Sequence, residues 1–189
     1  MKKICITNRK LCKNDFFSQI EYICRDGSVY ALILREKDLN DKDYEEYAVK
    51  CNDICKKYNV LFFINSKIDI SIKLNIKNIQ LSFKDFLENK EKLSSFKNIG
   101  ISVHFLKEAK IAENILKNWK NCFLIAGHIF ETNSKKSLPP RGINFLKEIC
   151  DNVYLPVFAI GGINKETIKL LDGINIAGVC MMSEFMEKT

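Results

Sequence analysis

Short apolar runs alternate with helical patterns along the whole chain, and this alternation limits the possible folds more than any other feature. Segments with apolar residues three and four positions apart, typical of amphipathic helices, lie at residues 16–23, 43–58, 68–74, 107–119, 143–150 and 165–171. Eight apolar runs with the length of buried strands lie at residues 3–8, 29–35, 60–65, 78–82, 98–104, 122–130, 156–162 and 176–183. Strands that alternate with helices run parallel and are joined by right-handed crossovers.

Eight such units close most economically into a barrel. We therefore predict an α/β protein with a (β/α)8 TIM-barrel fold, in which residues 1–189 form a single domain. Only residues 184–189 follow the last predicted strand, so the C-terminal helix must be shortened. A homodimer is one arrangement that would cover the gap in the outer ring.

The composition excludes several other classes of protein. An apolar content of 47% excludes a disordered chain, and 8 Gly with 3 Pro exclude a collagen-like one. The longest apolar runs, residues 60–64 and 177–182, are far shorter than the about 20 residues of a membrane span. The basic N-terminus lacks the long apolar core of a signal peptide. The net charge of +7 comes from 30 basic and 23 acidic residues that are interspersed, so we expect neither a nucleic-acid nor a membrane partner.

The eight cysteines indicate reduced thiols in the core. A zinc site would favour C-x2-C pairs, and none occurs. A disulfide framework belongs to small secreted chains. Several cysteines stand inside apolar runs, where the thiol acts as a small apolar group. We therefore expect a cytoplasmic protein with no metal site built from cysteine.

The active site of such a barrel lies where the strands end, and both histidines of the chain fall there. Imidazole is well suited to general acid–base catalysis near neutral pH. His128, next to the small residues Ala126 and Gly127, is our candidate catalytic residue. His104 is equally compatible with a structural role.

The loops after the last two strands predict an anion site. In these barrels such loops hold phosphate on backbone N–H groups. Gly161 and Gly162 end the seventh predicted strand, and Met182 and Ser183 end the eighth. We predict that these four residues bind a phosphate, with simple turn glycines as the alternative for the first pair.

Positively charged and polar side chains complete the predicted mouth of the barrel. They indicate an anionic ligand that carries phosphate and carboxylate groups, although a solvated cationic rim remains the alternative. The substrate-binding candidates are Arg35, Lys37, Asn65, Ser102 and Lys135.

Five segments of the chain resemble the thiamine phosphate synthase superfamily, and the longest resembles its thiazole tautomerase (TenI-type) branch. They are LREKDL at 34–39, FFIN at 62–65, GISVH at 100–104, GHIFETNSKKSLPPRG at 127–142 and PVFAIGGIN at 156–164. The resemblance implies a tautomerase that makes a carboxythiazole ethyl phosphate aromatic, with a thiazole phosphate as its small-molecule partner. His128 would move the proton, and neither metal nor redox cofactor would be needed. Arg35 and Lys37, diphosphate contacts in the synthases, would lie near the carboxylate of the substrate.

Three departures from the synthase pattern favour the same branch. The synthases hold magnesium through an aspartate at the position of Ser66 and through acidic residues after the fourth strand, of which only Asp85 remains here. They also hold the pyrimidine with a glutamine at the position of Ile33. Pyrophosphate displacement needs a well-held cation, so these changes argue against it.

Three alternatives stay open. The chain is a thiamine phosphate synthase that tolerates Ser66, a non-catalytic protein that carries or senses a thiazole phosphate, or an unrelated phosphate-binding barrel. Formation of thiamine phosphate from a pyrimidine diphosphate would identify the synthase. A carrier would keep its ligand affinity after the substitution His128→Asn.

Overall fold

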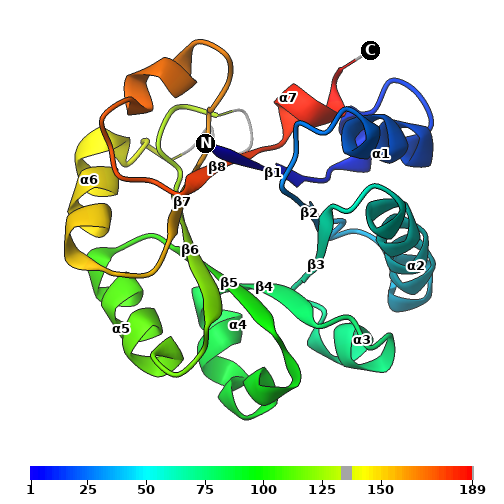
Figure 1. The fold of residues 1–189 in the computed structure, drawn as a ribbon, viewed down its shortest axis with the longest axis horizontal. Coiled ribbons are helices and arrows are strands. Elements are labelled where there is room, and N and C mark those ends of the chain that lie inside the picture. The colour runs from blue at the N-terminus through cyan, green and yellow to red at the C-terminus, as the bar shows by residue number, and fades with distance from the viewer. Residues whose placement is uncertain (133–137, 189) are drawn as a thin grey trace.

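The computed structural model describes residues 1–132 and 138–188, and its strands form a closed barrel (Figure 1). Every neighbouring pair is parallel, and β1 pairs with β8 to close the ring. The predicted barrel is thereby confirmed. The eight strands are β1 (Lys2–Ile6), β2 (Ala31–Leu34), β3 (Leu61–Asn65), β4 (Asn78–Ser82), β5 (Asn98–Val103), β6 (Asn121–Gly127), β7 (Val157–Ile160) and β8 (Gly178–Met181).

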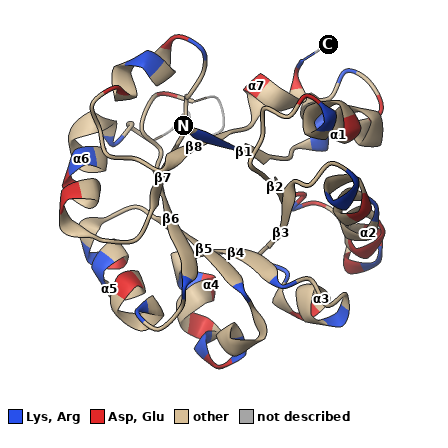
Figure 2. Ribbon diagram, viewed as in Figure 1, with Lys and Arg blue, Asp and Glu red and all other residues tan. Residues whose placement is uncertain are grey.

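Helices surround the barrel on the outside, and charged side chains of both signs lie along them (Figures 1 and 2). The helix α2 shows why these segments are helical. Asn40 accepts a hydrogen bond from the N–H of Asp43 at its start, acidic residues stand in its first turn and lysines in its last. The helices are α1 (Phe16–Arg25), α2 (Asp41–Lys57), α3 (Ile68–Lys73), α4 (Phe83–Glu88), α5 (Leu106–Leu116), α6 (Gly142–Asn152) and α7 (Ser183–Met186), with 3-10 turns η1 (Arg9–Leu11), η2 (Lys90–Ser95) and η4 (Thr167–Leu171).

The structure differs from the predicted elements after the fourth strand and at residues 165–171. The prediction has no helix after the fourth strand, whereas α4 begins there because the Ser82 hydroxyl accepts from the N–H of Asp85. The helix predicted at 165–171 is a short 3-10 turn. The Asn164 carboxamide holds its first residues by accepting from the N–H groups of Glu166 and Thr167.

Side chains alternate between two apolar layers, as they must in a barrel wall. The larger layer lies between the strands and the helices, and the smaller one fills the barrel interior. Inside, the ring of Phe123 packs edge-on against Phe63 and Phe158, with ring centroids 5.6 and 5.2 Å away. The Phe123 ring also fills the space opposite Gly100, where an added Cβ would lie 2.4 Å from its Cζ. Aromatic side chains therefore fill the barrel interior at the level of Phe123.

The short last helix packs against the first helix of the same chain. In α7, Phe185 and Met186 are buried, and the buried Gln19 of α1 donates to the Phe185 carbonyl at 2.7 Å. This contact joins α7 to α1, while the homodimer stays a prediction. No helix in the described ranges is both long and apolar enough to cross a membrane.

Candidate functional site

His128 follows β6 directly, at the end of the barrel where the strands terminate. The strand ends at Gly127 rather than at residue 130 as predicted, because Ile129 and Phe130 donate to the carbonyls of Ile160 and Gly161 instead of continuing the ladder with β5. The imidazole is only 6% exposed, and its Nε2 lies 3.2 Å from the Leu138 carbonyl oxygen. His128 is thus a buried side chain on a loop fixed against the end of β7.

The glycine pair after β7 allows this close approach. Gly161 has φ of +101° and Gly162 has φ of +64°. A Cβ on Gly161 would lie 2.3 Å from the Cβ of His128, and one on Gly162 would lie 2.2 Å from the Glu131 carbonyl oxygen. Close packing therefore requires glycine at both positions. The phosphate contact of this pair remains a prediction.

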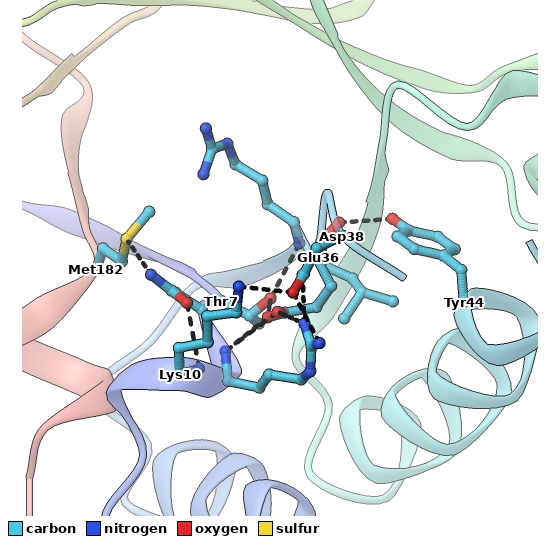
Figure 3. A network of polar contacts seen from close by, with 10 residues as sticks. Thr7, Lys10, Glu36, Asp38, Tyr44 and Met182 are labelled. Atoms are coloured by element: carbon cyan, nitrogen blue, oxygen red, sulfur yellow. Dashed lines mark hydrogen bonds and ion pairs between the residues drawn. The ribbon is translucent and has the colours of Figure 1, made fainter. Parts of the chain in front are cut away.

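The residues after β8 lie beside those after β1. Met182 is half-buried, and its Sδ is 3.8 Å from the carboxamide nitrogen of Asn8 (Figure 3). Ser183 is the first residue of α7. The structure places both at the same end of the barrel as His128, and their contact with a phosphate stays a prediction.

A buried carboxylate organises the loop after β2, and Figure 3 shows this network. Glu36 is 2% exposed and accepts from the Thr7 hydroxyl at 2.7 Å and from the backbone N–H and guanidinium of Arg9 at 3.0 and 3.2 Å. The Thr7 hydroxyl in turn accepts from the N–H of Arg35 at 2.9 Å. The Arg9 guanidinium also donates to the Asp38 carboxylate, and this contact lowers the pKa of that carboxyl group below its usual range. The network ties the ends of β1 and β2 together.

Arg35 and Lys37 stand on this anchored loop. Neither forms an ion pair with a carboxylate of residues 1–132 or 138–188. Burial lowers the pKa of the half-buried Arg35, and the neighbouring Glu36 raises it in part. Arg9 neutralises the negative charge of Glu36, so Arg35 and Lys37 remain available to an anion. Lys135, the third predicted cation, lies outside the described residues.

Three polar side chains form a chain of hydrogen bonds across β3, β4 and β5. The Asn65 amide nitrogen donates to the Gln80 side-chain oxygen at 2.6 Å, and the Gln80 amide nitrogen donates to the Ser102 hydroxyl at 2.8 Å. Asn65 and Ser102 were predicted, and the structure joins them. Gln80 was missed, although its place between outward-facing Ile79 and Leu81 indicates a side chain that faces the interior.

The fit of the site for magnesium depends on Ser66 and Asp85. The Ser66 hydroxyl donates to the Asp85 carboxylate at 2.8 Å, so the two residues lie side by side after β3 and β4. Among the described residues, no group of three or more His, Cys, Asp or Glu side chains could hold a metal ion. Magnesium, however, often binds through one or two carboxylates together with substrate phosphates. One carboxylate and one hydroxyl are therefore compatible with a magnesium ion that phosphate oxygens of a ligand also hold.

The other histidine contacts the backbone of β6. The Nδ1 of His104 forms a hydrogen bond with the Gly127 carbonyl oxygen, and the backbone N–H of His104 donates to the Glu108 carboxylate at 2.6 Å. These contacts favour the structural role that the sequence left open for His104.

The sequence of the chain matches one protein family over almost its whole length. A family model described as "Thiamine monophosphate synthase" matches residues 4–185. A thiamine-phosphate synthase of Fusobacterium nucleatum is 33% identical over 186 residues, which cover 97% of this chain and 88% of that protein. A putative thiamine-phosphate synthase 2 of Aquifex aeolicus is 33% identical over 183 residues, covering 96% of each. The structure of a thiamine phosphate pyrophosphorylase from Pyrococcus furiosus superposes with a TM-score of 0.81 at 24% identity, covering 99% of this chain and 88% of that one, and supports the fold.

Proposed function

This chain belongs to the thiamine monophosphate synthase family, and on that premise we propose that it is an enzyme of thiamine biosynthesis with thiamine-phosphate synthase activity. It would transfer a pyrimidine from its diphosphate to a thiazole phosphate and release pyrophosphate. The observation that carries the proposal is the near full-length similarity to relatives that bear this name. It favours the synthase over the tautomerase, which the sequence motifs placed first.

The loop after β2 supports diphosphate binding. Arg35 and Lys37 carry positive charge that no described carboxylate neutralises. The contacts of Glu36 with Thr7 and Arg9 hold the backbone of this loop, so these cations need little reordering on binding. They would bind the oxygens of the diphosphate and stabilise the charge that develops on the leaving group.

Asp85 and Ser66 would hold magnesium through a carboxylate and a hydroxyl. The ion would supply charge neutralisation of the departing pyrophosphate. The thiazole phosphate would lie on the other side of the mouth, against the backbone of Gly161, Gly162 and Ser183. This division places the two substrates on opposite arcs of the barrel rim.

Incubation of the purified protein with a pyrimidine-methyl diphosphate, a thiazole ethyl phosphate and MgCl2 tests the proposal. We expect thiamine phosphate and pyrophosphate in equal amounts by mass spectrometry and a coupled phosphate assay. Ser66→Asp should lower the magnesium concentration needed for half-maximal rate, because it adds a carboxylate beside Asp85. Ser94→Asp adds the same charge at an exposed position of η2 and should not. Absence of thiamine phosphate at saturating substrates and magnesium refutes the proposed activity.

His128 and Ser66 favour a second candidate, the thiazole tautomerase. Here a proton would leave ring C2 of a carboxythiazole phosphate and another would be added at the exocyclic carbon, which makes the ring aromatic. His128 is the one buried imidazole next to the glycine pair, and the reaction has no need of the second magnesium carboxylate. The ring formation is followed by ultraviolet absorbance.

Two variants separate this candidate from a carrier of thiazole phosphate. His128→Asn should lower the tautomerase rate by roughly 10²–10⁴-fold, the usual contribution of a positioned acid or base. His104→Asn removes the other imidazole and serves as the matched control. An unchanged rate in the His128 variant, with wild-type turnover above the uncatalysed reaction, would exclude this role of His128. Binding without any turnover would indicate the carrier.

A further inference from the structure

A pair of cysteine thiols lies between α1 and α2, two neighbouring helices on the outside of the barrel (Figure 1). The Sγ atoms of Cys24 in α1 and Cys55 in α2 are 3.9 Å apart and form a hydrogen bond. Both side chains are buried, with 1% and 0% exposure. Within residues 1–132 and 138–188, no other two thiols form a hydrogen bond with each other. The Cys5 thiol contacts the Met186 thioether instead, and a thioether cannot form a disulfide.

Contacts at both ends of the two helices fix their spacing. Next to the thiols, the Glu21 carboxylate of α1 accepts from the Lys57 ammonium at 2.6 Å and from the Tyr58 hydroxyl at 2.8 Å. At the mouth, the contact of Arg9 with Glu36 joins the loops that precede α1 and α2. A disulfide bond is about 2 Å long, so the two sulfurs need to approach each other by only about as much again.

The contact between the thiols also determines which of them is the nucleophile. The thiolate is the reactive form of cysteine. The hydrogen bond from Cys55 lowers the pKa of Cys24, while the same bond, together with burial, raises the pKa of Cys55. Burial also raises the pKa of Cys51, one turn before Cys55 in α2. Cys24 is therefore the attacking sulfur, and Cys55 is the partner that holds the proton.

The position of the pair near two helix ends gives a small oxidant access. Cys24 is the last but one residue of α1, and Cys55 is the third residue from the end of α2. Residues 25–27 and 56–57, which follow them directly, are exposed. Helix ends open locally at a lower free energy than the core of a protein. Hydrogen peroxide is little larger than water, so such openings are sufficient for it.

We propose that Cys24 and Cys55 form a redox modification site, at which a peroxide produces a disulfide that links α1 to α2. The Cys24 thiolate attacks one peroxide oxygen, so that an S–O bond forms and the O–O bond breaks. The hydroxide that leaves takes up the proton that Cys24 had released and becomes water. The Cys55 sulfur then attacks the sulfur of the sulfenic acid, so that the S–S bond forms, the S–O bond breaks and the second hydroxide leaves as water with the Cys55 proton.

The two thiols together lose two electrons and one peroxide becomes two waters, so no further reductant or oxidant is needed. The site lies at the end of the barrel where the strands begin, because α1 leads into β2 and α2 leads into β3. The proposal is therefore independent of the proposed function and of the residues at the mouth.

Peptide mapping of the full chain tests the proposal without any substrate. The reduced protein is treated with hydrogen peroxide at pH 8, denatured, alkylated, and cleaved with trypsin and with a protease that cuts before aspartate. Asp53 lies between Cys51 and Cys55, so these two cysteines fall on separate peptides. We expect a product that joins residues 15–25 to residues 53–56 and is about 2 Da lighter than the two reduced peptides together. Dithiothreitol should return both peptides.

Three variants separate proximity from burial. Cys24→Ala and Cys55→Ala should each abolish the linked product, whereas Cys51→Ala removes an equally buried thiol of the same helix and should keep it. The link closes a loop over 31 positions, so the peroxide-treated wild type should unfold at a midpoint about 5–10 °C higher than the reduced protein, and Cys55→Ala should show no such rise.

The mapping of the wild-type protein decides the matter even where a variant fails to fold. Absence of the linked product, a link from Cys24 to Cys51, or oxidation of the more exposed Cys12 and Cys150 before Cys24 overturns the proposal. A linked protein whose midpoint is unchanged or lower contradicts the stabilising link between α1 and α2.

Discussion

Substitution of Gly161 by alanine tests how the loop that carries His128 is held. The new Cβ would lie 2.3 Å from the His128 Cβ and 2.7 Å from its Cα, so it would collide with a backbone rather than with a flexible side chain. The φ of +101° adds backbone strain. Gly27→Ala is a matched control within the same chain, since Gly27 has φ of +68° and nothing within 4 Å of an added Cβ.

The expected magnitudes follow from this difference. Left-handed backbone costs an L-residue about 1–2 kcal/mol, which both variants share. Overpacking adds about 1–3 kcal/mol, and only Gly161→Ala incurs it. We therefore expect Gly161→Ala to be about 2 kcal/mol less stable than Gly27→Ala. For a chain of this size, that difference corresponds to a midpoint of thermal unfolding about 4–8 °C lower.

Urea unfolding followed by circular dichroism measures the two free energies of unfolding. The imidazole signals in a proton–carbon NMR spectrum report the loop directly, because the chain has only two histidines. The His128 signal should move further in Gly161→Ala than in Gly27→Ala. Equal midpoints and an unmoved His128 signal would show that the close packing of β7 against this loop is not what requires glycine.

Three further predictions concern charges and thiols. Glu36→Gln should lower the free energy of unfolding by about 1–3 kcal/mol, because it weakens the buried charged hydrogen bonds to Arg9, and Asp38→Asn should lower it less, as measured by urea midpoints. Arg9 lowers the pKa of Asp38, so the stability that Asp38 contributes is present above its unfolded pKa of about 3.9 and is lost as the pH falls from there towards the lower folded pKa. The difference in the free energy of unfolding between wild type and Asp38→Asn should therefore narrow from pH 6 to pH 3. A constant difference contradicts the assignment. Burial raises the pKa of the half-buried Cys150 to about 11 and that of the fully buried Cys180 further, so iodoacetamide at pH 8 should modify Cys150 first in peptide mapping; the reverse order would place Cys180 at the surface.

The fold followed from local patterns, whereas part of the site did not. The apolar run at 60–65 and the amphipathic segment after it are readable because burial on two faces and on one face leave different periodicities. The contact of Thr7 with Glu36 depends instead on the register of β1 against β2, in which Ile6 faces Ile33. Register between strands is a tertiary property that neither strand encodes alone.

Gln80 lies between these cases. A strict alternation of Ile79, Gln80 and Leu81 places the amide inside the barrel once the barrel is accepted, so its location was within reach of the sequence. Its partners were not, because they come from residues 15 and 22 positions away on two other strands. The choice between synthase and tautomerase depends on few positions, Ser66 above all, because the two classes share most of the sequence motifs of the barrel.

The pairing of β1 with β8 has a consequence for synthesis of the protein in the cell. The first strand leaves the ribosome about 170 residues before the strand that completes its hydrogen bonds. At translation speeds of roughly 5–20 residues per second, β1 waits on the order of 10–30 seconds with one edge open. Lys2 and Lys3 on that strand are the kind of residue that discourages mispairing of an open edge, so the nascent chain has a safeguard for this interval.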